Sequence, residues 1–124
     1  MKELVLRYLA IGFAGSLGAI ARYALGSQVG RLNYKFPLGT FIINITGSIF
    51  LGWFLTYIAK HQVSDITRLA IGTGFVGAYT TFSTFMYESN QLVDEGAMYL
   101  ATVNIIASLV VGILGVRLGI SLAK

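Results

Sequence analysis

The chain has 124 residues, of which 56% are hydrophobic and only 11% are charged. Soluble domains carry about 25% charged residues, so this composition indicates a membrane protein. The nine basic residues are scattered, and no basic run is present that could follow a phosphate backbone. With no Cys and a single His61, the sequence also excludes disulfides and Cys/His metal clusters. Because the basic residues form no run, we expect no nucleic-acid partner.

Four stretches are apolar and long enough to cross a bilayer, which takes ~20 residues. They are residues 4–25, 37–59, 66–92 and 97–118. The connections between them are short and polar, and the first is predicted to start at Gly26. Asp65 is expected to cap the third helix. Since no soluble domain remains, the sequence predicts one all-α, four-helix transmembrane domain over residues 1–124.

This topology places both termini and the second connection on one side of the membrane. Basic residues are in slight excess on that side, which favours placing it inside the cell. The bias is weak for so small a protein. Insertion in both orientations is thus permitted, and an antiparallel homodimer is a hypothesis.

Small and polar residues recur every four positions in spans two and four. They are Asn44, Ser48 and Gly52 in span two, and Asn104, Ser108 and Gly112 in span four. We interpret the glycines and Ser48 as packing residues that let helices approach closely in lipid. Asn44 has two readings that the spacing leaves open: a satisfied structural amide, or a donor that faces an aqueous path.

Two charged residues lie inside spans. Arg22, near the end of span one, either reaches the interface or a structural partner, or forms a basic vestibule that gathers anions. Glu88 is the only carboxylate well inside a span, and it shares a helical face with Thr81 and Thr84. It is either a proton-coupled cation site or a structural or gating group.

Span three contains the segment "GFVGAYTTFSTF", in which Gly and Thr interrupt an apolar helix. Both residue types are poor helix formers, so the third helix is predicted to break in the middle. A broken helix in a membrane must be buried in protein or line a watery cavity, where its free carbonyls can bind a cation.

Phe82 and Phe85 are three residues apart in this segment and share a face. They are either core or lipid-facing residues, or their positive ring edges meet an anion while nearby hydroxyls donate hydrogen bonds to it.

At these residues the sequence resembles the Fluc (CrcB) family of fluoride channels. The resemblance covers nearly the whole chain: four spans at this length, "GAIARY" in span one, "GTFIINITGS" in span two and "GFVGAYTTFSTF" in span three. It implies passive, fluoride-selective exit of fluoride across the plasma membrane of a prokaryote, which lowers toxicity. It also implies an antiparallel, dual-topology homodimer with two separate pores.

The resemblance also implies roles for individual residues. The predicted pore residues are Asn44, Phe82, Ser83, Thr84, Phe85 and Ser108. Gly77 and Thr80 would offer backbone carbonyls from both subunits to a structural Na⁺ at the dimer axis. Arg22 and Glu88 match family positions without a fixed role. In some members an aromatic hydroxyl stands near the position of Asn104, where this chain has an amide.

Two other functions compete with a channel. A small proton-coupled multidrug exporter needs a carboxylate inside the first span, which offers only Glu3 at its extreme end. A non-transporting membrane assembly subunit would leave the broken third span unexplained. No catalytic motif is present, so we do not expect an enzyme.

Overall fold

The computed structural model describes residues 1–124, and it contains helices and no strands. Three long helices, α1 (Lys2–Gly30), α2 (Leu38–Lys60) and α6 (Met98–Leu122), are each long and apolar enough to cross a membrane. Between α2 and α6 the chain forms four consecutive helical pieces. They are α3 (Asp65–Arg68), the π-helical stretch η1 (Leu69–Val76), α4 (Gly77–Tyr79) and α5 (Phe82–Asp94).

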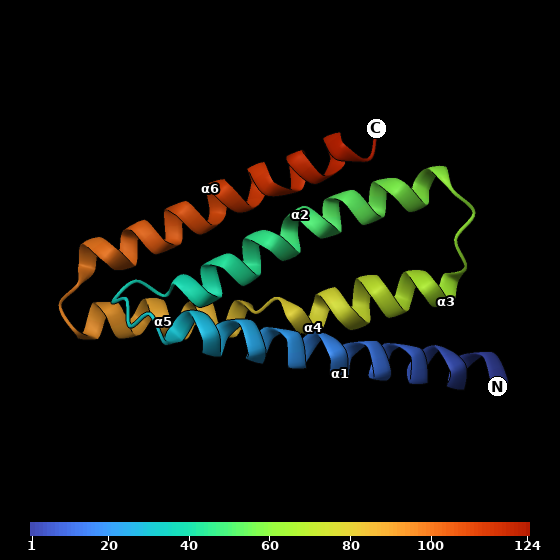
Figure 1. Cartoon of the computed structure of the whole chain (residues 1–124), viewed down its shortest axis with the longest axis horizontal. Coiled ribbons are helices and arrows are strands. Elements are labelled where there is room, and N and C mark those ends of the chain that lie inside the picture. Colours follow the sequence, from blue (N-terminus) through green and yellow to red (C-terminus); the bar gives the residue numbers. More distant parts are fainter.

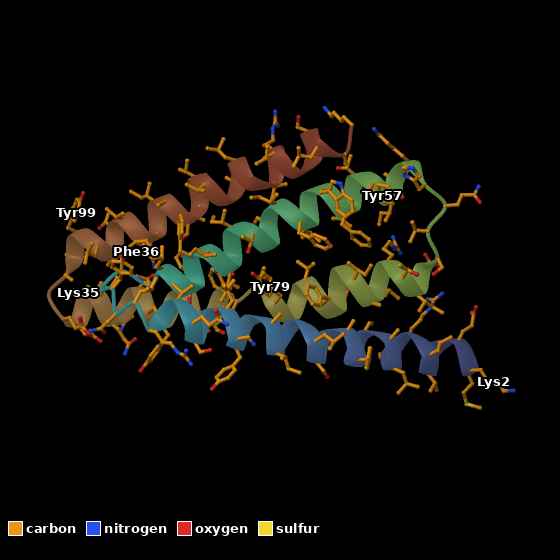
Figure 2. All side chains as sticks on the ribbon, viewed as in Figure 1. Lys2, Lys35, Phe36, Tyr57, Tyr79 and Tyr99 are labelled. Carbon is orange, nitrogen blue, oxygen red and sulfur yellow. The ribbon has the colours of Figure 1, made fainter.

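The helices run antiparallel along one long axis, and both termini lie at the same end of the molecule (Figure 1). In Figure 2, Lys2 marks this end and Lys35 marks the opposite end. Helix α6 packs on α2 and α5, whereas α1 packs on η1, α4 and α2. The segmented helix from α3 to α5 runs along the same axis, and its pieces α3, η1 and α4 pack against α1 (Figure 1).

One predicted helix cap is wrong, and two helices extend beyond the predicted spans. Helix α1 continues past Gly26 to Gly30, because Gly26 packs closely against Gly39 at the start of α2 and does not form a turn. Helix α6 extends to Leu122 instead of ending at residue 118. Asp65 lies in the first turn of α3, and the preceding Ser64 caps the helix by accepting a hydrogen bond of 3.2 Å from the Thr67 N–H.

Glycines allow the helices to approach closely at several contacts, two of which lie at Gly119 and Gly74. A Cβ atom at Gly119 of α6 would lie 2.7 Å from the backbone nitrogen of Trp53 and would also meet the Ile49 carbonyl of α2. A Cβ atom at Gly74 of η1 would lie 2.7 Å from the Ile11 carbonyl oxygen of α1. Both contacts are backbone to backbone, so no side chain fits there.

The outer surface of the bundle is apolar. Only 16 of the 124 residues are buried, and large side chains such as Phe13 and Ile113 remain 72% and 66% exposed. A soluble monomer does not expose apolar surface on this scale. Together with the three apolar helices, this surface identifies the chain as a multi-pass membrane protein.

The predicted break in the third span is confirmed. Between α4 and α5 the backbone is extended at Thr80 (φ −78°, ψ 158°) and at Thr81 (φ −150°, ψ 116°). The break is visible in Figure 1 as the stretch without coil between α4 and α5. Upstream of it, η1 has the wider π-helical winding, which is common near functional sites.

Candidate functional site

The helix break is bound to α2 through the side chain of Asn44. The Asn44 Nδ2 donates to the Thr81 carbonyl at 3.0 Å, and the Thr81 N–H donates to Asn44 Oδ1 at 2.8 Å. One carboxamide therefore satisfies both backbone groups that the break exposes at Thr81. Asn44 thus has a structural partner, and one N–H of its amide remains beyond this pair.

A second contact between α2 and the break lies close by. Tyr79, the last residue of α4, reaches Thr46 of α2, and their hydroxyls are 2.9 Å apart. Figure 2 places Tyr79 halfway along the molecule, between α4 and α2. Helix α2 therefore fixes the chain on both sides of the extended Thr80.

The break diverts two N–H groups from their regular acceptors. In an α-helix, the Thr81 N–H would bond to the Gly77 carbonyl, and the Thr84 N–H would bond to the Thr80 carbonyl. Here the Thr81 N–H bonds to Asn44, and the Thr84 N–H bonds to the Thr81 hydroxyl at 3.3 Å. The carbonyls of Gly77 and Thr80, the two predicted sodium ligands, thus lose their α-helical donors.

These carbonyl oxygens suit a hard cation such as Na⁺, which prefers oxygen ligands. The chain has no group of three or more His, Cys, Asp or Glu side chains that could hold a metal ion. A cation in this region would therefore be bound by backbone carbonyls and hydroxyls. The residues present fit the predicted ion.

Two cavities meet at Thr81. One, of about 240 Å³, is lined by Asn44, Ser48, Thr80 and Phe82 among others. The second, of about 610 Å³, lies between α1, α2 and α5 and includes Arg22, Thr40, Thr84 and Glu88 in its lining. Thr81 lines both cavities. Polar groups thus extend from the break toward the end of the bundle that holds Arg22.

The predicted face of Thr81, Thr84 and Glu88 is confirmed, since all three line the larger cavity. Glu88 and Arg22 share this cavity, but neither forms a salt bridge. One oxygen of Glu88, Oε2, is buried without a hydrogen-bond partner. The structure thus gives Arg22 and Glu88 a common cavity and leaves their charges unpaired.

The two phenylalanines of the third span differ in their surroundings. Their ring centroids are 6.1 Å apart and the planes are tilted by 53°. Phe85 is buried at 6% exposure, whereas Phe82 is 73% exposed. Ser83 beside it is also exposed. The pair therefore extends from the bundle interior to its surface.

Ser108 lies apart from the other predicted pore residues. It is on α6, lines neither of the two cavities, and donates to the Asn104 Oδ1 at 3.5 Å. The single chain does not bring it together with Asn44 or Phe82.

Thr40, which was not predicted from the sequence, lines the larger cavity with Glu88. A signal was present: Thr40 is four residues before Asn44 and extends the stripe of Asn44, Ser48 and Gly52 by one helical turn. Ser89, which was not predicted either, accepts a hydrogen bond from the buried Asn104. No spacing rule could pair these two, because they come from different helices.

Comparison with known proteins shows what the chain is similar to. Residues 9–120 match the family model described as CrcB-like protein, Camphor Resistance (CrcB). The chain is 47% identical over 116 residues to the fluoride-specific ion channel FluC of Acidobacterium capsulatum, which covers 92% of this chain and 93% of that protein.

Two further relatives carry the same description. The chain is 41% identical over 125 residues to FluC 1 of Bacillus thuringiensis subsp. konkukian, which covers 98% of this chain and 89% of that protein. It is also 42% identical over 113 residues to FluC 1 of Methanosarcina acetivorans, and the aligned region covers 90% of this chain and 86% of that protein. The similarity therefore spans almost the full length of both chains.

Proposed function

The chain belongs to the CrcB family, and we propose that it is a fluoride-specific channel that lets fluoride leave the cell passively. The observation that carries this proposal is similarity over nearly the full chain to relatives described as fluoride-specific ion channels. The protein is then an ion channel and not an enzyme. Lower cytoplasmic fluoride, and so lower toxicity, is the benefit to the cell.

The pore of this proposal must replace the water around a small, strongly hydrated anion and still release the ion. Asn44 has an amide N–H to spare, and Ser83, Thr84 and Ser108 carry hydroxyl donors. The edges of Phe82 and Phe85 carry positive quadrupole charge that attracts an anion. These groups bind fluoride without a permanent positive charge that would trap it.

Arg22 and Glu88 belong to the entrance of the proposed pore. Arg22 lines the cavity of about 610 Å³ and has no carboxylate partner, so its charge raises the local concentration of anions. Glu88 lies in the same cavity. We assign it a structural or gating role rather than proton coupling, because the carboxylate of a proton-coupled exporter is expected in the first span, whereas Glu88 lies in the third.

The functional unit of this proposal is an antiparallel, dual-topology homodimer in which each copy crosses the membrane four times. Besides the spans α1, α2 and α6, the third span along the chain is the segmented helix from α3 to α5, whose pieces together run along the bundle (Figure 1). The exposed Phe82 and Ser83 support a partner, since pore groups on an outer surface need a second wall. Ser108, remote from the cavities of its own chain, is then available to the pore of the assembly.

A structural Na⁺ completes the proposed dimer. The carbonyls of Gly77 and Thr80, which lack their α-helical donors, would hold it together with the same carbonyls of the second copy. The ion would neutralise carbonyl dipoles that otherwise face one another across the dimer axis. It is bound permanently in this proposal and is not transported.

The proposed location is the plasma membrane of a prokaryote. The relatives described above come from Acidobacterium capsulatum, Bacillus thuringiensis and Methanosarcina acetivorans, and the chain has membrane-spanning helices.

Fluoride efflux from liposomes that contain the purified protein tests the channel proposal. A fluoride electrode should record rapid loss of fluoride, and a chloride electrode should record little loss of chloride. Phe82→Ile should abolish fluoride flux, whereas Phe13→Ile, at a similarly exposed position on α1, should leave it intact. Absence of fluoride flux from well-folded protein would overturn the proposal, and flux driven by a proton gradient and lost in Glu88→Gln would favour an exporter.

A further inference from the structure

The most deeply buried polar side chain of the protein is not part of the proposed pore. Asn104 of α6 is 1% exposed and faces α5, where it contacts Ser89, itself 4% exposed. A buried carboxamide is costly unless its polar atoms are satisfied. Its position between two helices therefore needs an explanation beyond packing.

The hydrogen bonds around Asn104 have one consistent direction. The Ser89 hydroxyl donates its only proton to the Phe85 carbonyl at 2.7 Å. Asn104 must then act as the donor at Ser89, and its Nδ2 does so at 2.9 Å. This orients the amide so that Oδ1 accepts from Ser108 at 3.5 Å. The chain of bonds leads from α6 to the backbone of Phe85.

Helix α5 needs such an anchor because the extended Thr80 and Thr81 separate it from α4. The helix before the break therefore does not determine its position. At its start it is held to α2 by the Asn44 pair with Thr81. Apolar contacts alone specify register poorly in lipid, where the hydrocarbon tails are as apolar as the side chains. A single buried amide can specify register between helices.

We propose that Asn104 is a positioning residue, which fixes the register of α5 on α6 through Ser89 and thereby places Phe82 and Phe85, which both lie on α5, relative to α2 and α6. Asn104 does not contact fluoride in this scheme. The inference rests on the proposed function, in which Phe85 forms part of the pore wall.

The hydrogen-bond directions predict unequal effects of removing either partner. In Asn104→Leu, Ser89 keeps its bond to the Phe85 carbonyl, so no buried polar group of this pair is left without a partner. In Ser89→Ala, the Asn104 Nδ2 loses the acceptor that it has in the structure. Removing both groups leaves an apolar contact, which can be as stable as the polar one but lacks its register.

Thermal unfolding in detergent and fluoride efflux from liposomes should therefore separate stability from positioning. Ser89→Ala should lower the thermal midpoint more than Asn104→Leu does. The Ser89→Ala/Asn104→Leu double variant should recover the parent midpoint but conduct fluoride about tenfold more slowly or worse, because a loosely supported site loses function. Thr102→Val is the matched control, since its hydroxyl bonds only to the Met98 carbonyl on the exposed side of α6. A double variant with parent stability and parent flux would overturn the inference.

A second measurement reports on position without any fluoride flux. With 4-fluorophenylalanine at position 85, ¹⁹F NMR should give one resonance in the parent and in Thr102→Val. The double variant should give a shifted or split resonance, because the ring then samples other registers. An unchanged resonance would rule out a positioning role. If the parent conducts no fluoride but the double variant still gives the shifted or split resonance, only the proposed function would be overturned.

Discussion

The side chain of Asn44 replaces the helical hydrogen bonds of Thr81. Its carboxamide accepts from the Thr81 N–H at 2.8 Å and donates to the Thr81 carbonyl at 3.0 Å. Because an apolar environment offers no water to these groups, the break depends on this amide. From the sequence alone, Asn44 could be either a structural amide or a pore donor. The structure shows that it is a structural amide, and one N–H of its amide remains available to a pore.

Asn44→Asp should destabilise the folded protein. A carboxylate still accepts from the Thr81 N–H but has no N–H for the Thr81 carbonyl, and a buried group without a partner costs about 1–3 kcal/mol. Chemical or thermal unfolding in detergent would measure the loss. Ser48→Ala is the control, because Ser48 bonds only to the Asn44 carbonyl within α2. Equal stability of Asn44→Asp and the parent would show that this amide does not support the break.

Sodium should stabilise the protein through the break, if the ion binds to the carbonyls of Gly77 and Thr80. Replacing Na⁺ with a bulky organic cation at constant ionic strength should lower the thermal midpoint of the parent. Thr81→Val should reduce this dependence, because the Thr81 hydroxyl caps α5 next to the Thr80 carbonyl, and its loss loosens the backbone that presents this carbonyl.

The control for the sodium experiment is Ser16→Ala, which removes a hydroxyl that bonds only within α1 and lies far from the break in sequence. Its response to Na⁺ should equal that of the parent. A midpoint that does not depend on the cation in any variant would contradict the proposed sodium site.

Gly119→Ala should disrupt the contact between α2 and α6. The added methyl would lie 2.7 Å from the backbone nitrogen of Trp53 and would also meet the Ile49 carbonyl, so the two helix backbones must separate. Overpacking of this kind costs about 1–3 kcal/mol. Gly112→Ala on the same helix is the control, because its nearest neighbour is the flexible tip of Ile45 at 3.9 Å. Thermal midpoints that fall equally in both variants would refute a specific role for Gly119.

Ser64→Ala should cost more stability than Asp65→Asn. Ser64 caps α3, and loss of such a cap costs about 1 kcal/mol. Asp65 forms ion pairs of 3.6 Å with Arg7 and Arg68, but it is exposed, and exposed pairs contribute about 0–1 kcal/mol. Unfolding of both variants at low and high salt would test this order. If Asp65→Asn lost more stability than Ser64→Ala at low salt, and this excess loss disappeared at high salt, the predicted order would be contradicted.

Much of the fold followed from local patterns in the sequence. Long apolar runs predict membrane helices whatever surrounds them, because a bilayer requires each span to satisfy its own backbone. The Gly and Thr residues around Thr80 also predicted the helix break, because helix propensity is a local property of the sequence. The motif of span three also identified the family, which the comparisons confirmed.

Other features depended on contacts between distant segments. Spacing could not show that Asn44 pairs with Thr81, or that Asn104 bonds to Ser89, because each pair joins two helices. It misplaced the end of α1, because whether Gly26 forms a turn or a packing contact is decided by Gly39 of the next helix. Local composition thus determined where helices form and where one breaks, whereas the packing of helices on one another decided which polar groups are satisfied and which remain free for an ion.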